Sequence, residues 1–214
     1  MPKRVYLIRH GETQGTAEGR LMGATDQPLS AHGTSQVLRL AELLPAGLLA
    51  PGAATWCVAS PLQRAQQTAE CVAGRAGLTI TTDDDLREMH FGAWEGLTSQ
   101  EIEERFPREQ AQWASPTDDT AFPDGECLGD FQERVARAQK RILERPEDAV
   151  MVFTHGGVVR ELICGFLGLG HESYWMFAVQ PASVARVDVY DGASGAPGAA
   201  ALSGLWSVHD WEVE

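Results

Sequence analysis

Two histidines, two arginines and one glutamate lie where a parallel β-sheet would gather them. Arg9 and His10 directly follow one short apolar run, Arg64 comes soon after a second, and His155 follows a third. Glu88 lies between the last two, in the stretch LREMHFGAWEG. Open α/β sheets bind their ligands beyond the carboxyl ends of the strands. These five side chains are therefore the first candidates for a functional site.

The residue types in this set suit phosphoryl transfer. An arginine fork binds a tetrahedral oxyanion through two hydrogen bonds, an imidazole is a nucleophile at neutral pH, and a carboxylic acid can protonate a leaving alkoxide. Gly156 and Gly157 would let the backbone and a helix N-terminus approach an anion closely. Ser60 lies in ASPLQ, which is not a GxSxG nucleophile motif, and the chain has no P-loop motif. We therefore predict chemistry through a phosphohistidine.

The composition argues against several classes of protein. The formal net charge of −13 disfavours binding to nucleic acid and to anionic membrane surfaces. No segment approaches the roughly 18 uninterrupted apolar residues of a membrane span. The four cysteines are scattered without the spacing of a zinc site, so we expect them to be reduced. We predict a cytoplasmic protein with no nucleic-acid or membrane partner, in which a local positive cluster must bind any anion.

Strands and helices alternate along most of the chain. Short apolar or alternating runs predict strands at 5–8, 54–59, 78–82, 149–153, 183–190 and 204–209, of which 183–190 has the pattern of an edge or antiparallel strand. Apolar residues spaced by three and four predict helices after Ser30, after Thr98, over 128–142 and over 158–167. We expect the first of these helices to end at Pro45. A further helix should begin at Ser60, with Ser60 as its N-cap and Gln63 completing a capping box.

This alternation predicts the α/β class, as a three-layer α/β/α sandwich with a mainly parallel sheet. Residues 84–127 lack this alternation of strands and helices and are rich in tryptophan, proline and acidic residues. We interpret them as a cap insertion that covers the site, within a single domain over 1–214.

Five blocks of the sequence resemble the histidine phosphatase superfamily, also called the phosphoglycerate mutase-like family. They are LIRHGET (7–13), GRLMGATDQPLSAHG (19–33), ASPLQRAQQTA (59–69), LREMHFGAWEG (86–96) and FTHGGVVREL (153–162). The tripeptide RHG alone is a weak signal, but five blocks in the family's order are specific. The resemblance implies the phosphoglycerate mutase-like fold, a small phosphomonoester as substrate, and neither a metal ion nor an organic cofactor.

The resemblance also implies catalytic roles. His10 would be the nucleophile that accepts the phosphoryl group. Glu88 would be the general acid for the leaving oxygen and then the base for the attacking water. His155 would contact the phosphate and stabilise charge in the transition state.

Four further residues would bind phosphate. Arg9 and Arg64 would hold its oxygens, with help from the backbone N–H of Gly156. Thr16 departs from the family pattern, because many members carry asparagine six residues after the nucleophilic histidine. Its hydroxyl can still donate a hydrogen bond, so we expect activity to survive the change.

Within the family, the modest length of the insertion favours hydrolysis over a mutase reaction. The blocks at 86–96, 122–135, 154–169 and 182–191 look most like the α-ribazole-5′-phosphate phosphatases of cobalamin assembly. Aromatic and apolar side chains in or near the insertion would suit the dimethylbenzimidazole of such a substrate, or would serve only to pack the insertion. They are Met89, Phe91, Trp94, Trp113 and Trp175.

Other readings stay open. The enzymatic alternatives are a broad-specificity sugar-phosphate phosphatase and a phosphoglycerate mutase, and a non-catalytic module that binds phospho-ligands is the alternative from another class. We expect His171 to have a structural or surface role, whereas Arg20 and Arg160 either frame the pocket or pair with surface acids. A homodimer is compatible with the sequence, which assigns no face to it.

Overall fold

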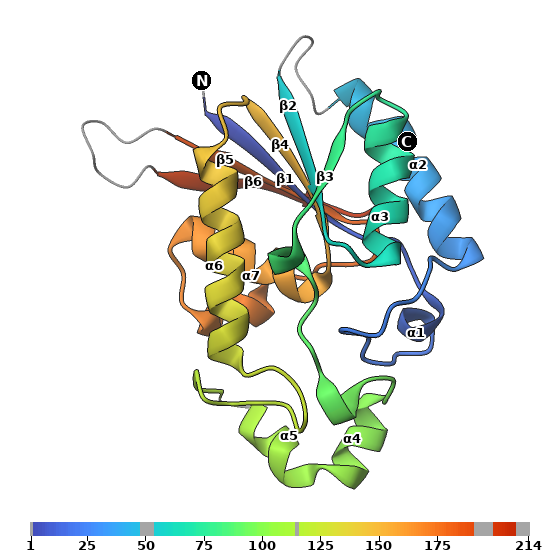
Figure 1. The fold of residues 1–214 in the computed structure, drawn as a ribbon, viewed down its shortest axis with the longest axis vertical. Coiled ribbons are helices and arrows are strands. Elements are labelled where there is room, and N and C mark those ends of the chain that lie inside the picture. The colour runs from blue at the N-terminus through green and yellow to red at the C-terminus, as the bar shows by residue number, and fades with distance from the viewer. Residues whose placement is uncertain (1, 48–53, 114–115, 191–198, 209–214) are drawn as a thin grey trace.

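A mixed six-stranded sheet forms the centre of the molecule (Figure 1). The structure, a computed structural model, describes residues 2–47, 54–113, 116–190 and 199–208. The strands are β1 (Lys3–Arg9), β2 (Thr55–Ala59), β3 (Ile80–Thr82), β4 (Ala149–Thr154), β5 (Val184–Val189) and β6 (Ala200–Trp206). Their order is β3-β2-β4-β1-β5-β6; the first four are parallel, and β5 and β6 are antiparallel to their neighbours. The predicted α/β fold is confirmed.

Helices cover both faces of this sheet, as Figure 1 shows. They are α2 (Ala31–Gly47) and α3 (Gln63–Ala69) on one face, and α6 (Leu128–Glu144) and α7 (Gly156–Leu167) on the other. Side chains alternate across a strand, so β1 sends Tyr6 and Ile8 into the cluster under α2, and Val5 and Leu7 into the cluster under α6. The three predicted layers are therefore present: the sheet is the middle layer, and one hydrophobic core lies between it and the helices on each face.

The described residues of 84–127, which are 84–113 and 116–127, contain only short elements, and those of 99–113 lie beyond one end of the sheet (Figure 1). They include 3₁₀ turns at Asp84–Leu86 and Gly92–Trp94, helix α4 (Ser99–Arg105) and helix α5 (Pro107–Trp113). Helix α4 follows Thr98 as predicted, and Thr98 and Glu101 form a capping box at its start. The remaining short elements are α1 (Gln14–Ala17), a π-helical turn at Glu70–Gly74 and a 3₁₀ segment at His171–Met176.

Two predicted helix boundaries are wrong. Helix α2 continues to Gly47, past Pro45. Helix α3 begins at Gln63, with Leu62 at the N-cap position and no side-chain capping bond. Ser60 lies too far before this helix to cap it, and its hydroxyl is within hydrogen-bond distance of the His155 ring at 2.8 Å. A capping motif is local, and here a partner from another strand has taken the hydroxyl.

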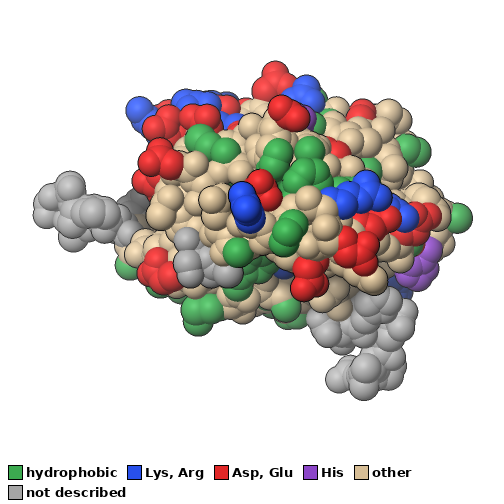
Figure 2. Space-filling view, turned by 90° about the horizontal axis from the view of Figure 1, so that it is seen from below, with side chains coloured by type: hydrophobic (Ala, Val, Ile, Leu, Met, Phe, Trp, Pro, Cys, Tyr) green, Lys and Arg blue, Asp and Glu red, His purple; other side chains and the backbone are tan. Residues whose placement is uncertain are grey.

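Among the residues that the structure describes, no helix has the length and apolar character needed to cross a membrane. Seen from the end that carries α4 and α5, acidic and basic side chains lie beside one another across the surface, with hydrophobic side chains between them (Figure 2).

Candidate active site

Most of the predicted site residues follow the carboxyl ends of three adjacent parallel strands, whereas Thr16 lies in α1 and Glu88 follows the 3₁₀ turn Asp84–Leu86. The backbone N–H of His10, after β1, donates to the Thr154 carbonyl at the end of β4, at 2.9 Å. The N–H of Ser60, after β2, donates to the Phe153 carbonyl at the same distance. The His10 and His155 rings consequently meet edge to face, with their centroids 5.1 Å apart. Strand register therefore brings together two histidines that are far apart in the sequence.

Hydrogen bonds fix the tautomer of His10. Its Nδ1 lies 2.6 Å from the Gly11 carbonyl oxygen, which can only accept, so Nδ1 carries the proton. Its Nε2 is left with a lone pair, 3.2 Å from the Nε of Arg64. Burial, followed by the charges of Arg64 and Arg9, holds the pKa of His10 well below its usual value. This ring is a neutral imidazole whose nucleophilic atom is Nε2.

His155 is also neutral and is fully buried. Its Nδ1 accepts from the same Arg64 Nε at 3.1 Å, and its Nε2 donates to the Ser60 hydroxyl. Burial is the largest cause that lowers the pKa of His155, followed by the charges of Arg64 and His10. One guanidinium N–H is thus shared between the two histidines.

Arg64 is completely buried, and its guanidinium forms hydrogen bonds both to the two histidines and to a backbone loop. Its Nη1 donates to the Thr25 carbonyl at 2.9 Å, and its Nη2 donates to the Gly23 carbonyl at 2.7 Å. The sequence suggested an arginine fork that faces phosphate, whereas here both Nη atoms bond to the loop and only Nε faces the histidines. Arg64 therefore fixes the histidine pair in this structure, and its predicted contact with phosphate remains a prediction.

Arg9 presents a free donor in the same region. Its Nη1 donates to the Val179 carbonyl at 2.6 Å, while its buried Nε has no hydrogen-bond partner in the described part of the chain. A Cβ at Gly156 would lie 3.3 Å from this Nε, so the start of α7 approaches it closely. Burial lowers the pKa of Arg9 to about 10, and the group stays charged at neutral pH. A buried N–H of a cation without a partner suits an anionic ligand.

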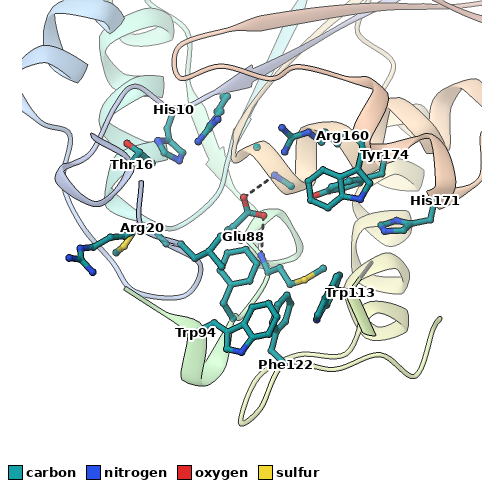
Figure 3. Close-up of a pocket in the computed structure, with 18 residues that line it drawn as sticks. His10, Thr16, Arg20, Glu88, Trp94, Trp113, Phe122, Arg160, His171 and Tyr174 are labelled. Carbon is teal, nitrogen blue, oxygen red and sulfur yellow. Dashed lines mark hydrogen bonds between the residues drawn. The ribbon is translucent and has the colours of Figure 1, made fainter. Parts of the chain in front are cut away.

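Glu88 lies opposite these groups and is 9% exposed. Its carboxylate accepts from the Gly157 N–H at 2.9 Å and from the Met89 N–H at 3.1 Å (Figure 3). A side chain at position 157 would overlap with this carboxylate and displace it, so glycine leaves room for Glu88 in this position. The backbone at the start of α7 thus holds the carboxylate in place.

Thr16 is engaged within its own turn. Its hydroxyl donates to the Thr13 carbonyl at 2.9 Å and accepts from the Thr13 N–H at 2.8 Å. The bond from the Thr13 N–H, together with the one that the Thr16 N–H donates to the Thr13 hydroxyl, forms the reciprocal capping box of α1. Thr16 lines the cavity described next, but its hydroxyl proton is already used, and its role towards phosphate remains a prediction.

A cavity of about 280 Å³ opens beside His10. Figure 3 shows Glu88 between His10 and a group of aromatic side chains that includes Trp94, Trp113 and Phe122. The lining also includes Arg9, Thr16, Arg20, Leu21, Met22, Met89, Phe91, Gly156, Gly157, Arg160, His171, Tyr174 and Trp175. Of the seven predicted site residues, five line this cavity, while Arg64 and His155 contact His10 without lining it.

The sequence analysis did not identify two residues that line this cavity, Tyr174 and His171. Tyr174, to which it gave no role, is buried, and its hydroxyl lies near Gly157. His171, expected to be structural or on the surface, lines the cavity and pairs with Glu161 at 3.2 Å. No local pattern marks either residue, because both reach the cavity only through the packing of the His171–Met176 segment against α7. Among the described residues, no group of three His, Cys, Asp or Glu side chains could hold a metal ion.

The two buried histidines predict how stability depends on pH. Their folded-state pKa values lie below the unfolded value of 6.5, so the unfolded chain takes up these protons first as the pH falls. The two histidines therefore contribute fully to the free energy of unfolding above about pH 6.5. Below that pH the free energy of unfolding falls by about 1.4 kcal/mol per pH unit for each histidine, until the histidine is protonated in the folded protein as well. Urea unfolding at pH 7.5 and pH 5.5 measures this loss. The variant His155→Asn should lose less between the two pH values, and an equal loss in both proteins would contradict the prediction.

Comparisons with known proteins agree with this geometry. The family model of the histidine phosphatase superfamily (branch 1) matches residues 5–196. The probable phosphoglycerate mutase GpmB of Salmonella arizonae is 33% identical over 213 residues, which cover 99% of this chain and 91% of that protein. The chain therefore belongs to the histidine phosphatase superfamily.

Solved structures narrow the class of enzyme. A putative α-ribazole-5′-P phosphatase from Escherichia coli matches with a TM-score of 0.84 at 29% identity, covering 97% of this chain and 98% of that one. A mycobacterial glucosyl-3-phosphoglycerate phosphatase matches with a TM-score of 0.80 at 27% identity, covering 97% and 99%. This chain is a phosphatase with the phosphoglycerate mutase-like fold.

Proposed function

We propose that this phosphatase hydrolyses small phosphomonoesters through a phosphohistidine on Nε2 of His10, without a metal ion, and that its substrate is α-ribazole-5′-phosphate of cobalamin assembly. The single observation that carries the mechanism is the tautomer of His10. The Gly11 carbonyl holds the proton on Nδ1, which leaves the Nε2 lone pair beside the cavity wall that holds Glu88.

In the first step, Nε2 of His10 gives up the hydrogen bond from Arg64 Nε and attacks phosphorus, and a P–N bond forms as the P–O bond to the leaving group breaks. A proton on the Glu88 carboxyl passes to the leaving alkoxide, so the product departs as a neutral alcohol. The Nε–H of Arg9, which has no partner in the described part of the chain, donates to the phosphoryl oxygens on which charge develops.

In the second step, Glu88 accepts a proton from water as the water oxygen attacks phosphorus. The P–N bond breaks, inorganic phosphate leaves, and Nε2 regains its lone pair. The Gly157 N–H holds the Glu88 carboxylate in one orientation, so the same group can serve first as acid and then as base.

The aromatic wall of the cavity favours a substrate whose leaving group carries an aromatic ring. Trp113 stacks on Phe122 with ring centroids 4.3 Å apart, and Trp94 and Phe91 contact Phe122 edge to face, each at 5.0 Å. These side chains pack against one another and also line the cavity, so the two readings of the aromatic residues are compatible. A flat apolar ring such as dimethylbenzimidazole suits such a wall.

A second candidate is a phosphatase for sugar phosphates that also carry a carboxylate, which is the class named for the mycobacterial neighbour. Arg160 favours it. This guanidinium lines the cavity, lies 5.5 Å from the ring of Tyr174, and forms no ion pair with a carboxylate of the described residues. Its Nε donates to the Phe177 carbonyl at 2.9 Å, and a cation with no anionic partner among the described residues suits a second anionic group on the substrate.

A panel of phosphomonoesters distinguishes these candidates. We expect kcat/KM for α-ribazole-5′-phosphate to exceed that for 3-phosphoglycerate and glucosyl-3-phosphoglycerate by about tenfold or more, because a buried aromatic ring adds binding energy. Activity should be the same with and without EDTA. Preference for either carboxylate substrate would support the second candidate, and phosphoryl exchange between phosphoglycerates faster than phosphate release would contradict hydrolysis. Sizing of the purified protein would decide between a monomer and the homodimer.

A further inference from the structure

Glu95 binds an unusual number of backbone N–H groups. It follows the 3₁₀ turn Gly92–Trp94, and its Oε1 accepts from Ala24 at 2.8 Å and from Phe91 at 3.0 Å. Its Oε2 accepts from Gly23 at 3.1 Å and from Thr25 at 3.2 Å. Burial raises the pKa of this half-buried carboxyl, but the hydrogen bonds outweigh burial and lower the pKa overall, so the group is charged at neutral pH.

The loop that Glu95 holds is also the loop that holds Arg64. Its N–H groups point to Glu95, while its carbonyl oxygens at Gly23 and Thr25 accept from the two Nη atoms of Arg64. The Nε of Arg64 then lies 3.2 Å from Nε2 of His10. An unbroken series of hydrogen bonds thus runs from Glu95, through one turn of backbone, to the nucleophilic atom.

The same carboxylate ties this loop to the Glu88 side of the site. The loop lies so close to the turn after Glu88 that a Cβ on Gly23 would overlap with the Met89 carbonyl and with the Glu95 carboxylate. Nearby, the Leu21 N–H donates to the Leu97 carbonyl, and the Gly96 N–H donates to the Leu21 carbonyl. Glu95 therefore lies where segments on both sides of the cavity meet.

We propose that Glu95 is a positioning residue, which fixes the loop 22–25 so that Arg64 is held between His10 and His155. It touches neither the nucleophile nor the cavity. It acts by setting the place of the one guanidinium N–H that the two histidines share. Its kinetic consequence rests on the proposed phosphohistidine mechanism, whereas its effect on the histidine rings does not.

The variant Glu95→Gln tests this with little change of shape. A glutamine keeps one acceptor oxygen but turns an NH₂ group towards two of the four N–H groups, so half of the anchor is lost. The matched control is Asp188→Asn. Asp188 is buried, accepts from Arg186 and Ser203, and lies on β5 opposite Arg4, at the end of the sheet away from His10.

The kinetic readout separates positioning from stability. Displacement of Arg64 should lower kcat of Glu95→Gln about tenfold, with KM changed less than about threefold, because misplacement of a catalytic group costs rate more than binding. The control should lose stability but keep its kcat. In a double-mutant cycle with Arg64→Ala, Glu95→Gln should cost little further activity. Additive losses, or an equal loss of kcat in the control, would overturn the proposal.

A titration followed by NMR needs no turnover and no Arg64 variant. With Arg64 held less firmly, its charge lowers the pKa of His10 less, so that pKa should rise by about half a unit or more in Glu95→Gln. It should not move in Asp188→Asn. An unchanged His10 titration in Glu95→Gln would overturn the positioning role. Because this readout is independent of catalysis, its failure is distinct from failure of the proposed phosphatase mechanism, which His10→Ala tests.

Discussion

The variant His10→Ala should lose about 10³-fold or more in kcat, because no other group can accept the phosphoryl group in its place. The neutral ring of His10 has a lone pair on Nε2 and lines the cavity, whereas His155, also neutral, contacts His10 without lining it. Steady-state release of phosphate from p-nitrophenyl phosphate measures the loss. Rapid quenching with labelled substrate should show an acid-labile, base-stable phosphoenzyme in the wild type and none in the variant.

The control for this experiment is His32→Ala. His32 lies on the exposed side of α2 and does not line the cavity, so its removal should leave kcat and the phosphoenzyme unchanged. A His10→Ala protein that is folded and hydrolyses substrate at the wild-type rate would disprove the mechanism. A phosphoenzyme that persists in this variant would show that the nucleophile is a different residue.

The second large effect is expected for Glu88→Gln, and it should depend on the leaving group. An alkyl phosphate needs a proton on its leaving oxygen, so kcat should fall by about 10²-fold or more. A nitrophenolate leaves without a proton, and the first step should then be nearly unaffected. The second step still needs a base for water. With p-nitrophenyl phosphate, the variant should therefore give a burst of one nitrophenolate per site, followed by slow turnover.

Glutamine can replace only part of the local hydrogen bonding. Both carboxylate oxygens accept backbone N–H groups, from Gly157 and Met89, so the variant should also lose about 1 kcal/mol of stability. Urea unfolding checks that the protein remains folded during the assay. Equal losses of kcat for alkyl and nitrophenyl substrates, with no burst, would remove Glu88 from the acid and base roles.

Much of the fold could be predicted because its signals are local. The continuous apolar run of β4 is buried along its whole length, and the apolar positions of α6 at Leu128, Phe131 and Val135 all face the core. Periodicity reports which face of an element is apolar, and burial of that face drives folding. The boundaries at Pro45 and Ser60 were wrong because propensity and capping are weak compared with tertiary contacts.

The sequence by itself determined that three of the site's side chains meet. Parallel strands share one carboxyl edge, so residues that follow β1, β2 and β4 had to converge, and His10, Arg64 and His155 do so. What each side chain does at that edge was not determined in this way. Gly11, the neighbour of His10, sets its tautomer, but Arg64 and Ser60 reach the histidines from segments tens of residues away, in directions that depend on the packed backbone.

Only the tertiary structure decided two features of the site. It turned the Nη atoms of Arg64 towards a loop and gave the Ser60 hydroxyl to His155. It also assigned Glu95, seven residues after Glu88 in a block that the sequence had already singled out, to the anchoring of that loop. The physical reason is that a buried polar group must find a partner, and which partner lies within reach is a property of the whole fold.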